Sequence, residues 1–167
     1  MLTIGPVTAQ SSPELIEEAR ALFRSYGEFL RASGGPALLC FSGLEDEIAT
    51  LPSTYSENDG EVLLATLGTH GAGCIAYRSM GPSDPACCEI KRLFVVSEFR
   101  GQGLGKRLVS AALDRARQHN YRTAVLDTEP HSMAVAKQIY LDLGFSLDAE
   151  RNARAENSLV TYFRKSL

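Results

Sequence analysis

The 167-residue chain lacks the patterns that would assign it to several common protein classes. It has four cysteines and three histidines, but no C-x-x-C pair and no histidine cluster, so the sequence predicts no metal site. Its N-terminus lacks a basic segment followed by an apolar run, and no stretch approaches the roughly 18 apolar residues of a membrane span. We therefore expect a cytoplasmic protein with reduced, mostly buried cysteines.

Composition and charge exclude further classes. The length suits one domain, predicted over residues 1–167, and the 44% apolar and 22% charged residues are ordinary for a globular protein. The net charge of -3 gives no reason to expect nucleic acid or an anionic membrane as a partner. The stretch from position 89 to position 107, however, contains five basic residues and only two acidic ones. A positive pocket on an acidic protein suits a small anionic cofactor.

That basic segment contains a strand followed by a glycine-rich turn. Residues 89–96 are rich in Ile, Leu, Phe and Val, which predicts a strand. The turn R-G-Q-G-L-G, residues 100–105, then precedes helical periodicity to about His119. Its glycines allow a tight turn and a close approach of ligand to main-chain N–H groups, and a helix N-terminus adds unpaired donors and partial positive charge. The segment therefore predicts a cradle for phosphate or pyrophosphate.

Two familiar phosphate motifs fail at specific residues. The dinucleotide motif G-x-G-x-x-G would need a glycine where Lys106 stands. A Walker A loop ending at Gly105-Lys106 would need glycine in place of Arg100, and Ser or Thr in place of Arg107. A domain that binds another nucleotide is therefore disfavoured, and the pattern that fits is R-x-x-G-x-G after a strand.

Hydrophobic periodicity and turn residues predict an alternating α/β chain. Pro6 in the first strand indicates an edge position, and Gly68 and Gly71 favour an antiparallel hairpin. The strand at 86–96, the helix after it and the strand at 123–127 should form a right-handed β-α-β unit. Strands are expected at 3–9, 61–67, 72–79, 86–96, 123–127, 145–148 and 159–164, helices at 12–32, 44–50, 103–119 and from 130 to about 143, an apolar piece at 38–41, and polar loops at 53–60 and 150–157.

These features resemble the GNAT superfamily of acyl-CoA-dependent N-acetyltransferases. Residues 136–145, A-K-Q-I-Y-L-D-L-G-F, are similar to the family signature A-x-x-x-Y-x-x-x-G-F, and E-I-K-R-L-F-V and L-D-T-E-P-H-S-M resemble a bacterial subgroup. The resemblance implies the α/β GNAT fold: a mixed sheet of about six or seven strands, about four helices, and the order β-α-α-β-β-β-α-β-α-β-β. Met133 departs from the asparagine that many members carry as a cofactor contact.

The resemblance also implies a reaction, the transfer of acetyl from acetyl-CoA to a primary amine by direct attack through a tetrahedral intermediate. The turn would hold the pyrophosphate of coenzyme A, and a main-chain N–H near Leu93 or Phe94 would face the acetyl carbonyl. Tyr140 would protonate the leaving thiolate, the alternative being a core tyrosine with a hydrogen-bonded hydroxyl. The implied cofactor-binding residues are Leu93, Phe94, Val95, Arg100, Gly101, Gln102, Gly103, Leu104, Gly105 and Lys106.

The base that would deprotonate the amine has more than one candidate. Glu89 on the central strand is the first, and its alternative role is a salt bridge with Lys91 or Arg92. Glu47 is a weaker candidate, in an acidic helix that either faces solvent or lines the amine site. A substrate that arrives neutral would need no base. Lys91 and Arg92 could steer phosphates or bind an acidic part of the acceptor.

The acceptor amine itself is open at this point. Small molecules, amino acids, antibiotics and protein N-termini or lysines all fit the implied chemistry. A non-catalytic module that senses acyl-CoA is the alternative function. The family's tendency to dimerise allows a homodimer.

Overall fold

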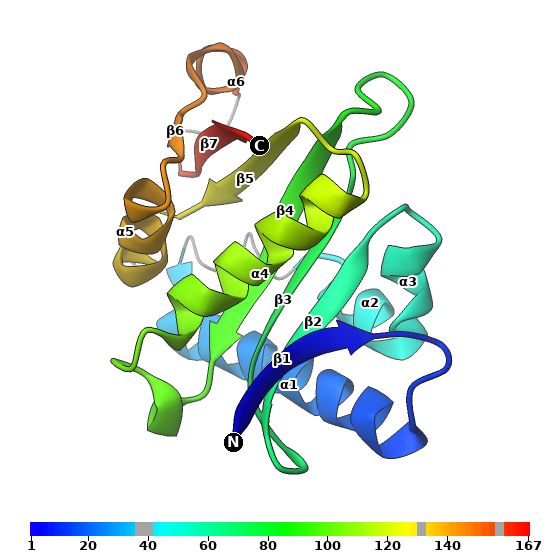
Figure 1. Ribbon diagram of the computed structural model, residues 1–167. Coiled ribbons are helices and arrows are strands. Elements are labelled where there is room, and N and C mark those ends of the chain that lie inside the picture. The colour runs from blue at the N-terminus through cyan, green and yellow to red at the C-terminus, as the bar shows by residue number, and fades with distance from the viewer. Residues whose placement is uncertain (36–41, 130–132, 156–158) are drawn as a thin grey trace.

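The computed structural model describes residues 1–35, 42–129, 133–155 and 159–167 (Figure 1). A mixed sheet of seven strands, in the order β1-β2-β3-β4-β5-β7-β6, separates helices on its two faces. The strands are β1 (Leu2–Val7), β2 (Glu61–Leu67), β3 (His70–Ser79), β4 (Cys87–Val95), β5 (Thr123–Thr128), β6 (Ser146–Leu147) and β7 (Thr161–Ser166). The helices are α1 (Pro13–Ser33), α2 (Leu44–Thr50), α3 (Ser53–Ser56), α4 (Leu104–Gln118), α5 (Ala134–Asp142) and α6 (Ala149–Arg154).

The predicted order of elements is confirmed, with two short helices added. The prediction of polar loops at 53–60 and 150–157 was wrong in part, because these segments contain α3 and most of α6. Asp148 caps α6 by accepting a hydrogen bond from the Arg151 N–H, but no residue of that helix is buried. A six-residue helix without an apolar face leaves no periodic signal. The segments expected at 38–41 and 130–132 lie outside the described residues.

The strands of the first half pair as the turn residues indicate. β1 forms the edge of the sheet, where Pro6 lies opposite Leu63 of β2. β2 and β3 form an antiparallel hairpin around Gly68, whose φ is 64°. The edge position of Pro6 and the hairpin are therefore both confirmed.

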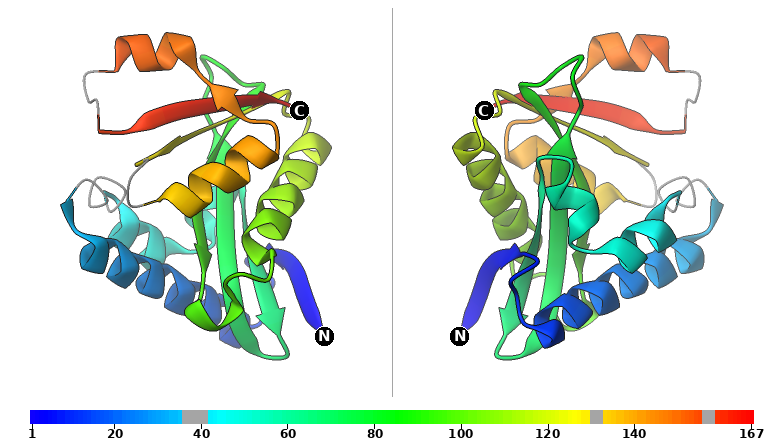
Figure 2. Two further views of the ribbon diagram at one scale, coloured as in Figure 1. Left: turned by 90° about the vertical axis from the view of Figure 1, so that its left-hand side faces the viewer. Right: turned by 90° about the vertical axis from the view of Figure 1, so that its right-hand side faces the viewer.

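Each face of the sheet carries its own core. On one face α4 buries Leu104, Leu108 and Ala112 against β2, β3 and β4, together with Tyr140 of α5. On the other face α1 buries Leu22 and its neighbours with residues of α2 and α3. Figure 2 shows α1, α2 and α3 on the opposite side of the sheet from α4 and α5. The sheet thus separates two cores, each covered by different helices.

The central parallel pair stays together for only part of its length. β4 and β5 pair from Cys87 opposite Thr123 to Glu89 opposite Val125, and no further pair follows although both strands continue. The strands then diverge, as Figure 2 shows. We call this divergence the β4–β5 fork: Ile90–Val95 of β4 and Leu126–Thr128 of β5. At the fork, the sheet is open between β4 and β5.

The described cysteines are buried thiols. Cys74, Cys87 and Cys88 are free and buried, which confirms the expectation for these three. Burial raises the pKa of Cys87 to about 11 and that of Cys88 to about 12, so both stay protonated near neutral pH. Among the residues described, no helix is long and apolar enough to cross a membrane, and no group of three His, Cys, Asp or Glu could hold a metal ion.

Candidate active site

The glycine-rich turn links β4 to α4 and leaves the start of that helix open. Gly101 and Gly103 have φ values of 75° and 74°, a left-handed conformation that glycine adopts without a steric penalty. Gly103 is the N-cap of α4, and no side chain caps this end of the helix. A Cβ atom added at either glycine would meet nothing within 4 Å. The turn therefore offers helix N–H donors and the positive end of the helix dipole to an anion in open space.

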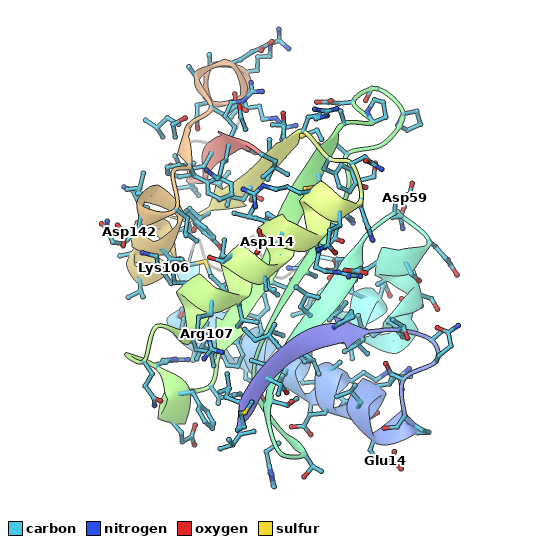
Figure 3. The ribbon with its side chains drawn as sticks, in the orientation of Figure 1. Glu14, Asp59, Lys106, Arg107, Asp114 and Asp142 are labelled. Atoms are coloured by element: carbon cyan, nitrogen blue, oxygen red, sulfur yellow. The ribbon has the colours of Figure 1, made fainter. Side chains whose placement is uncertain are left out.

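Three cations lie beside this turn. Lys106 and Arg107 are exposed in the first turn of α4 (Figure 3). Arg100 is fixed more firmly: its Nε donates to the Val95 carbonyl at 2.8 Å, and its guanidinium lies 5.3 Å from the ring centre of Phe29. Stacking on aromatic rings holds such a cation in place without neutralising it. The turn thus combines open backbone donors with three positive charges.

At the other predicted cofactor contacts, the side chains pack against the protein or form local hydrogen bonds. Leu104 is buried in the core under α4, and a Cβ at Gly105 would come within 2.9 Å of the Ile139 side chain of α5. The side chains of Leu93 and Val95 pack against the core under α4, and Phe94 lies in the core under α1. Gln102 donates through Nε2 to the Glu98 carbonyl at 3.1 Å. The side chains of Phe94 and Leu104 are buried, so at these positions the main chain is what a ligand could contact.

The backbone of β4 is irregular inside the fork. Lys91 lies opposite Ala76 and Phe94 lies opposite Cys74, so the single residue Ile75 faces both Arg92 and Leu93. This two-against-one pairing is a β-bulge, which leaves a backbone position outside the ladder. Arg92 adopts a φ of 61°, in the left-handed region that side chains disfavour. The bulge therefore places irregular main chain in the part of β4 that no longer pairs with β5.

Glu47 lies beneath the bulge and is bound to Arg92. Its carboxylate accepts from Arg92 Nε at 2.9 Å and Nη2 at 2.8 Å, and from the Tyr55 hydroxyl at 2.7 Å. Only 8% of Glu47 and 6% of Arg92 is exposed. Burial alone would raise the pKa of Glu47, but the hydrogen bonds and charge of Arg92 lower it below its usual value. A buried carboxylate held ionised by this pair is a poor candidate for a base.

Glu89 sits at the last paired position before the fork. Its carboxylate accepts from Arg78 Nε at 3.1 Å and lies 3.9 Å from Lys91 Nζ, with the side chain 21% exposed. The salt bridge considered from the sequence is present with Lys91, whereas Arg92 turns to Glu47 instead. Arg78 was missed, because its position opposite Glu89 depends on the register of β3 and β4. Burial lowers the pKa of Lys91, which the negative charge of Glu89 opposes.

Asp127 is a second carboxylate of this region that sequence reasoning missed. Val125 pairs with Glu89, and Asp127 follows two residues later on β5, so both carboxylates project from the same face of the sheet. Asp127 is exposed, yet partial removal from water raises the pKa of its carboxyl, and the charge of Glu89 raises it further. Glu89, directly before the fork, and Asp127, within it, are therefore two carboxylates on the same face of the sheet.

Tyr140 approaches from the other face of the sheet. Its side chain lies in the core under α4 and α5, where 7% of the residue is exposed and its ring meets the edge of Phe145 at 5.7 Å. Met133 precedes α5 as its N-cap and makes no capping hydrogen bond with its side chain. Glu89 and Tyr140 thus flank the fork from opposite faces of the sheet, one partly exposed and the other buried.

A cavity of about 990 Å³ lies away from these residues. Its walls come from the end of β1, the segment after α3, the β3–β4 connection and the C-terminal end of α4. The residues of the glycine-rich turn and of the fork do not line it. The candidate site is therefore defined by the turn and the fork.

Comparison with known proteins gives one consistent result. The model of the acetyltransferase (GNAT) family matches residues 19–145. An uncharacterized N-acetyltransferase of Schizosaccharomyces pombe is 31% identical over 141 residues, covering 83% of this chain and 81% of that protein.

Solved structures agree on the fold. PaiA N-acetyltransferase from Thermoplasma acidophilum, in complex with coenzyme A, superposes with a TM-score of 0.67 at 18% identity, covering 100% of this chain and 99% of that one. A GNAT acetyltransferase from Elizabethkingia anophelis with acetyl-CoA bound has a TM-score of 0.62 at 22% identity, with 99% and 98% covered.

Proposed function

The chain belongs to the acetyltransferase (GNAT) family, and we propose that it transfers acetyl from acetyl-CoA to a primary amine by direct attack of the amine nitrogen. The observation that carries this proposal is the uncapped N-terminus of α4, which opens behind a left-handed glycine turn next to the fork. Proteins of the same fold bind coenzyme A or acetyl-CoA. Acetyl-CoA supplies the acetyl group as an activated thioester.

The turn would bind the pyrophosphate of this molecule. No side chain caps the start of α4, the backbone at Gly101 and Gly103 borders open space, and Arg100, Lys106 and Arg107 add positive charge beside it. Charge-assisted hydrogen bonds from backbone donors at a helix start suit a pyrophosphate. The main chain of Leu93–Val95 would bind the pantetheine arm, and an N–H near Leu93 or Phe94 would polarise the acetyl carbonyl.

Proton transfer falls to residues on the two sides of the fork. Glu89 would take the proton of the amine, directly or through water, and its pairing with Arg78 and Lys91 fixes its position. Tyr140 would return a proton to the leaving thiolate. A phenol of pKa about 10 is a weaker acid than a thiol of about 8.5, so this transfer is uphill by itself and is favoured when it accompanies cleavage of the thioester bond or when the site shifts either pKa.

Calorimetric titration with acetyl-CoA, with ATP as the control ligand, tests the cofactor assignment. Micromolar binding of acetyl-CoA alone supports it, and an amine screen that follows release of the free thiol then tests turnover. Failure to bind acetyl-CoA would overturn the proposal. Binding without turnover of any amine would instead favour the acyl-CoA sensor.

A further inference from the structure

The β4 bulge holds a conformation that Arg92 would not adopt without support. A residue with a side chain at a φ of 61° pays about 1–2 kcal/mol relative to the right-handed regions. The bulge also takes Arg92 and Leu93 out of one-to-one pairing with β3, and the Arg92 carbonyl accepts from Cys74 Sγ at 3.5 Å. Since β5 has already diverged, β4 pairs here with β3 alone, at Lys91 and Phe94 on either side of the bulge.

The Arg92 side chain supplies the missing restraint. Its guanidinium makes a two-pronged bond to Glu47 of α2, donates to the Ser42 carbonyl at 3.3 Å and lies 6.0 Å from the Tyr26 ring centre of α1. Glu47 is fixed in turn by the Tyr55 hydroxyl. Buried ion pairs contribute little net stability, because desolvation offsets the attraction. Their geometry, however, is well defined, which suits a positioning role.

We propose that the Glu47–Arg92 pair positions the bulge for catalysis. By anchoring the side chain of Arg92, the pair holds the backbone in the left-handed conformation that directs the following N–H, of Leu93 or Phe94, toward the thioester carbonyl. This inference rests on the proposed function, because it needs acetyl-CoA in the fork. Glu47 and Arg92 are positioning residues: they act through the main chain and do not contact the acetyl group.

Two double variants distinguish the effect of the backbone conformation at position 92 from the effect of the ion pair. Glu47→Gln/Arg92→Gly and Glu47→Gln/Arg92→Ala both remove the two charges, but only glycine adopts a positive φ without a steric cost. Tyr55→Phe is the control, since it removes a hydrogen bond to the same carboxylate and leaves Arg92 in place. Circular dichroism and calorimetric titration first verify the fold and the affinity for acetyl-CoA.

The readout is the infrared carbonyl stretch of bound acetyl-CoA, labelled with carbon-13 at the acetyl carbonyl. In the wild type a hydrogen bond from the bulge should lower this frequency relative to free acetyl-CoA. The alanine double variant should lose that shift and at least about tenfold in kcat, since a lost oxyanion donor costs about 100-fold or more. The glycine double variant should keep most of the shift. Tyr55→Phe should keep at least as much, because it removes one support of Glu47 and leaves both bonds between Glu47 and Arg92 in place.

The outcomes separate this inference from the function on which it rests. Loss of acetyl-CoA binding by the wild type overturns the proposed function and this inference with it. A wild-type carbonyl frequency in the alanine double variant, or equal loss in both double variants, overturns only the positioning role. If neither double variant folds, Arg92→Lys keeps a charge against Glu47 with fewer donors. It should then show a partial loss of the shift at unchanged affinity, and a full shift would contradict the proposal.

Discussion

Gly103→Asp should abolish tight binding of acetyl-CoA while leaving the protein folded. The change places a carboxylate at the N-cap of α4, where a Cβ meets nothing within 4 Å. Steric clash with the protein is therefore absent, and a negative charge at a helix N-terminus is favourable to the helix itself. The cost falls on the ligand, because the new charge faces the place predicted for the pyrophosphate.

The magnitude follows from Coulomb's law. At a separation of about 6 Å and an effective dielectric constant of about 20, two like unit charges repel by about 2.8 kcal/mol. That energy corresponds to a weakening of about 100-fold in Kd. Because the site is exposed to solvent, the effect should shrink as salt is added.

Gly103→Asn is the matched control. Asparagine has nearly the same size as aspartate and is among the residues most tolerant of a positive φ, so both variants carry a similar backbone cost at 74°. Titration calorimetry at low and high salt compares the two variants, and thermal melting compares their stability. Equal Kd values for the Asp and Asn variants would refute the assignment of this turn to the pyrophosphate.

Three further substitutions test the fork. Tyr140→Phe should lower kcat by about 100-fold or more with acetyl-CoA affinity nearly unchanged, whereas an unaltered kcat would show that Tyr140 has a purely structural role. Glu89→Gln should lower activity most at low pH, where the amine most needs a base, and an unchanged pH profile would remove Glu89 from that role. Asp127→Asn should raise the melting temperature at pH 7 but not at pH 3. The folded state raises the pKa of Asp127, so ionisation weakens folding above that pKa, and the penalty disappears below the unfolded value of about 3.9.

The sequence was sufficient for most of the fold because its signals are local. The periodicity of residues 104–118 and the glycines before them mark α4 within a residue or two of its observed bounds. Pro6 marks the edge strand in the same direct way. By contrast, α6 has no apolar face, so the property that identifies most helices is missing from it.

The candidate site was only partly predictable, because several of its contacts depend on distant pairings. Arg92 was assigned to Glu89 or to a ligand, yet its partner is Glu47, 45 positions earlier in the chain. The pairing depends on the bulge, which turns Arg92 onto the face that α2 covers. A bulge that begins at an arginine with a positive φ gives no signal in composition or periodicity. Arg78 and Asp127 were not predicted for a related reason, because only the strand register brings them near Glu89.

The charges around the fork also bear on which carboxylate serves the amine. Glu89 lies between the cations of Arg78 and Lys91, whereas Arg92 binds Glu47 and lowers its pKa, which makes Glu47 a weaker base. Asp127 differs, because partial removal from water and the charge of Glu89 raise its pKa toward the range in which a carboxylate accepts a proton more readily. Asp127 is therefore a direct competitor of Glu89 for the role of base. If the acidic limb of the pH–rate profile survives Glu89→Gln but disappears in Asp127→Asn, the proton passes to β5, and Glu89 serves to orient Arg78 and Lys91.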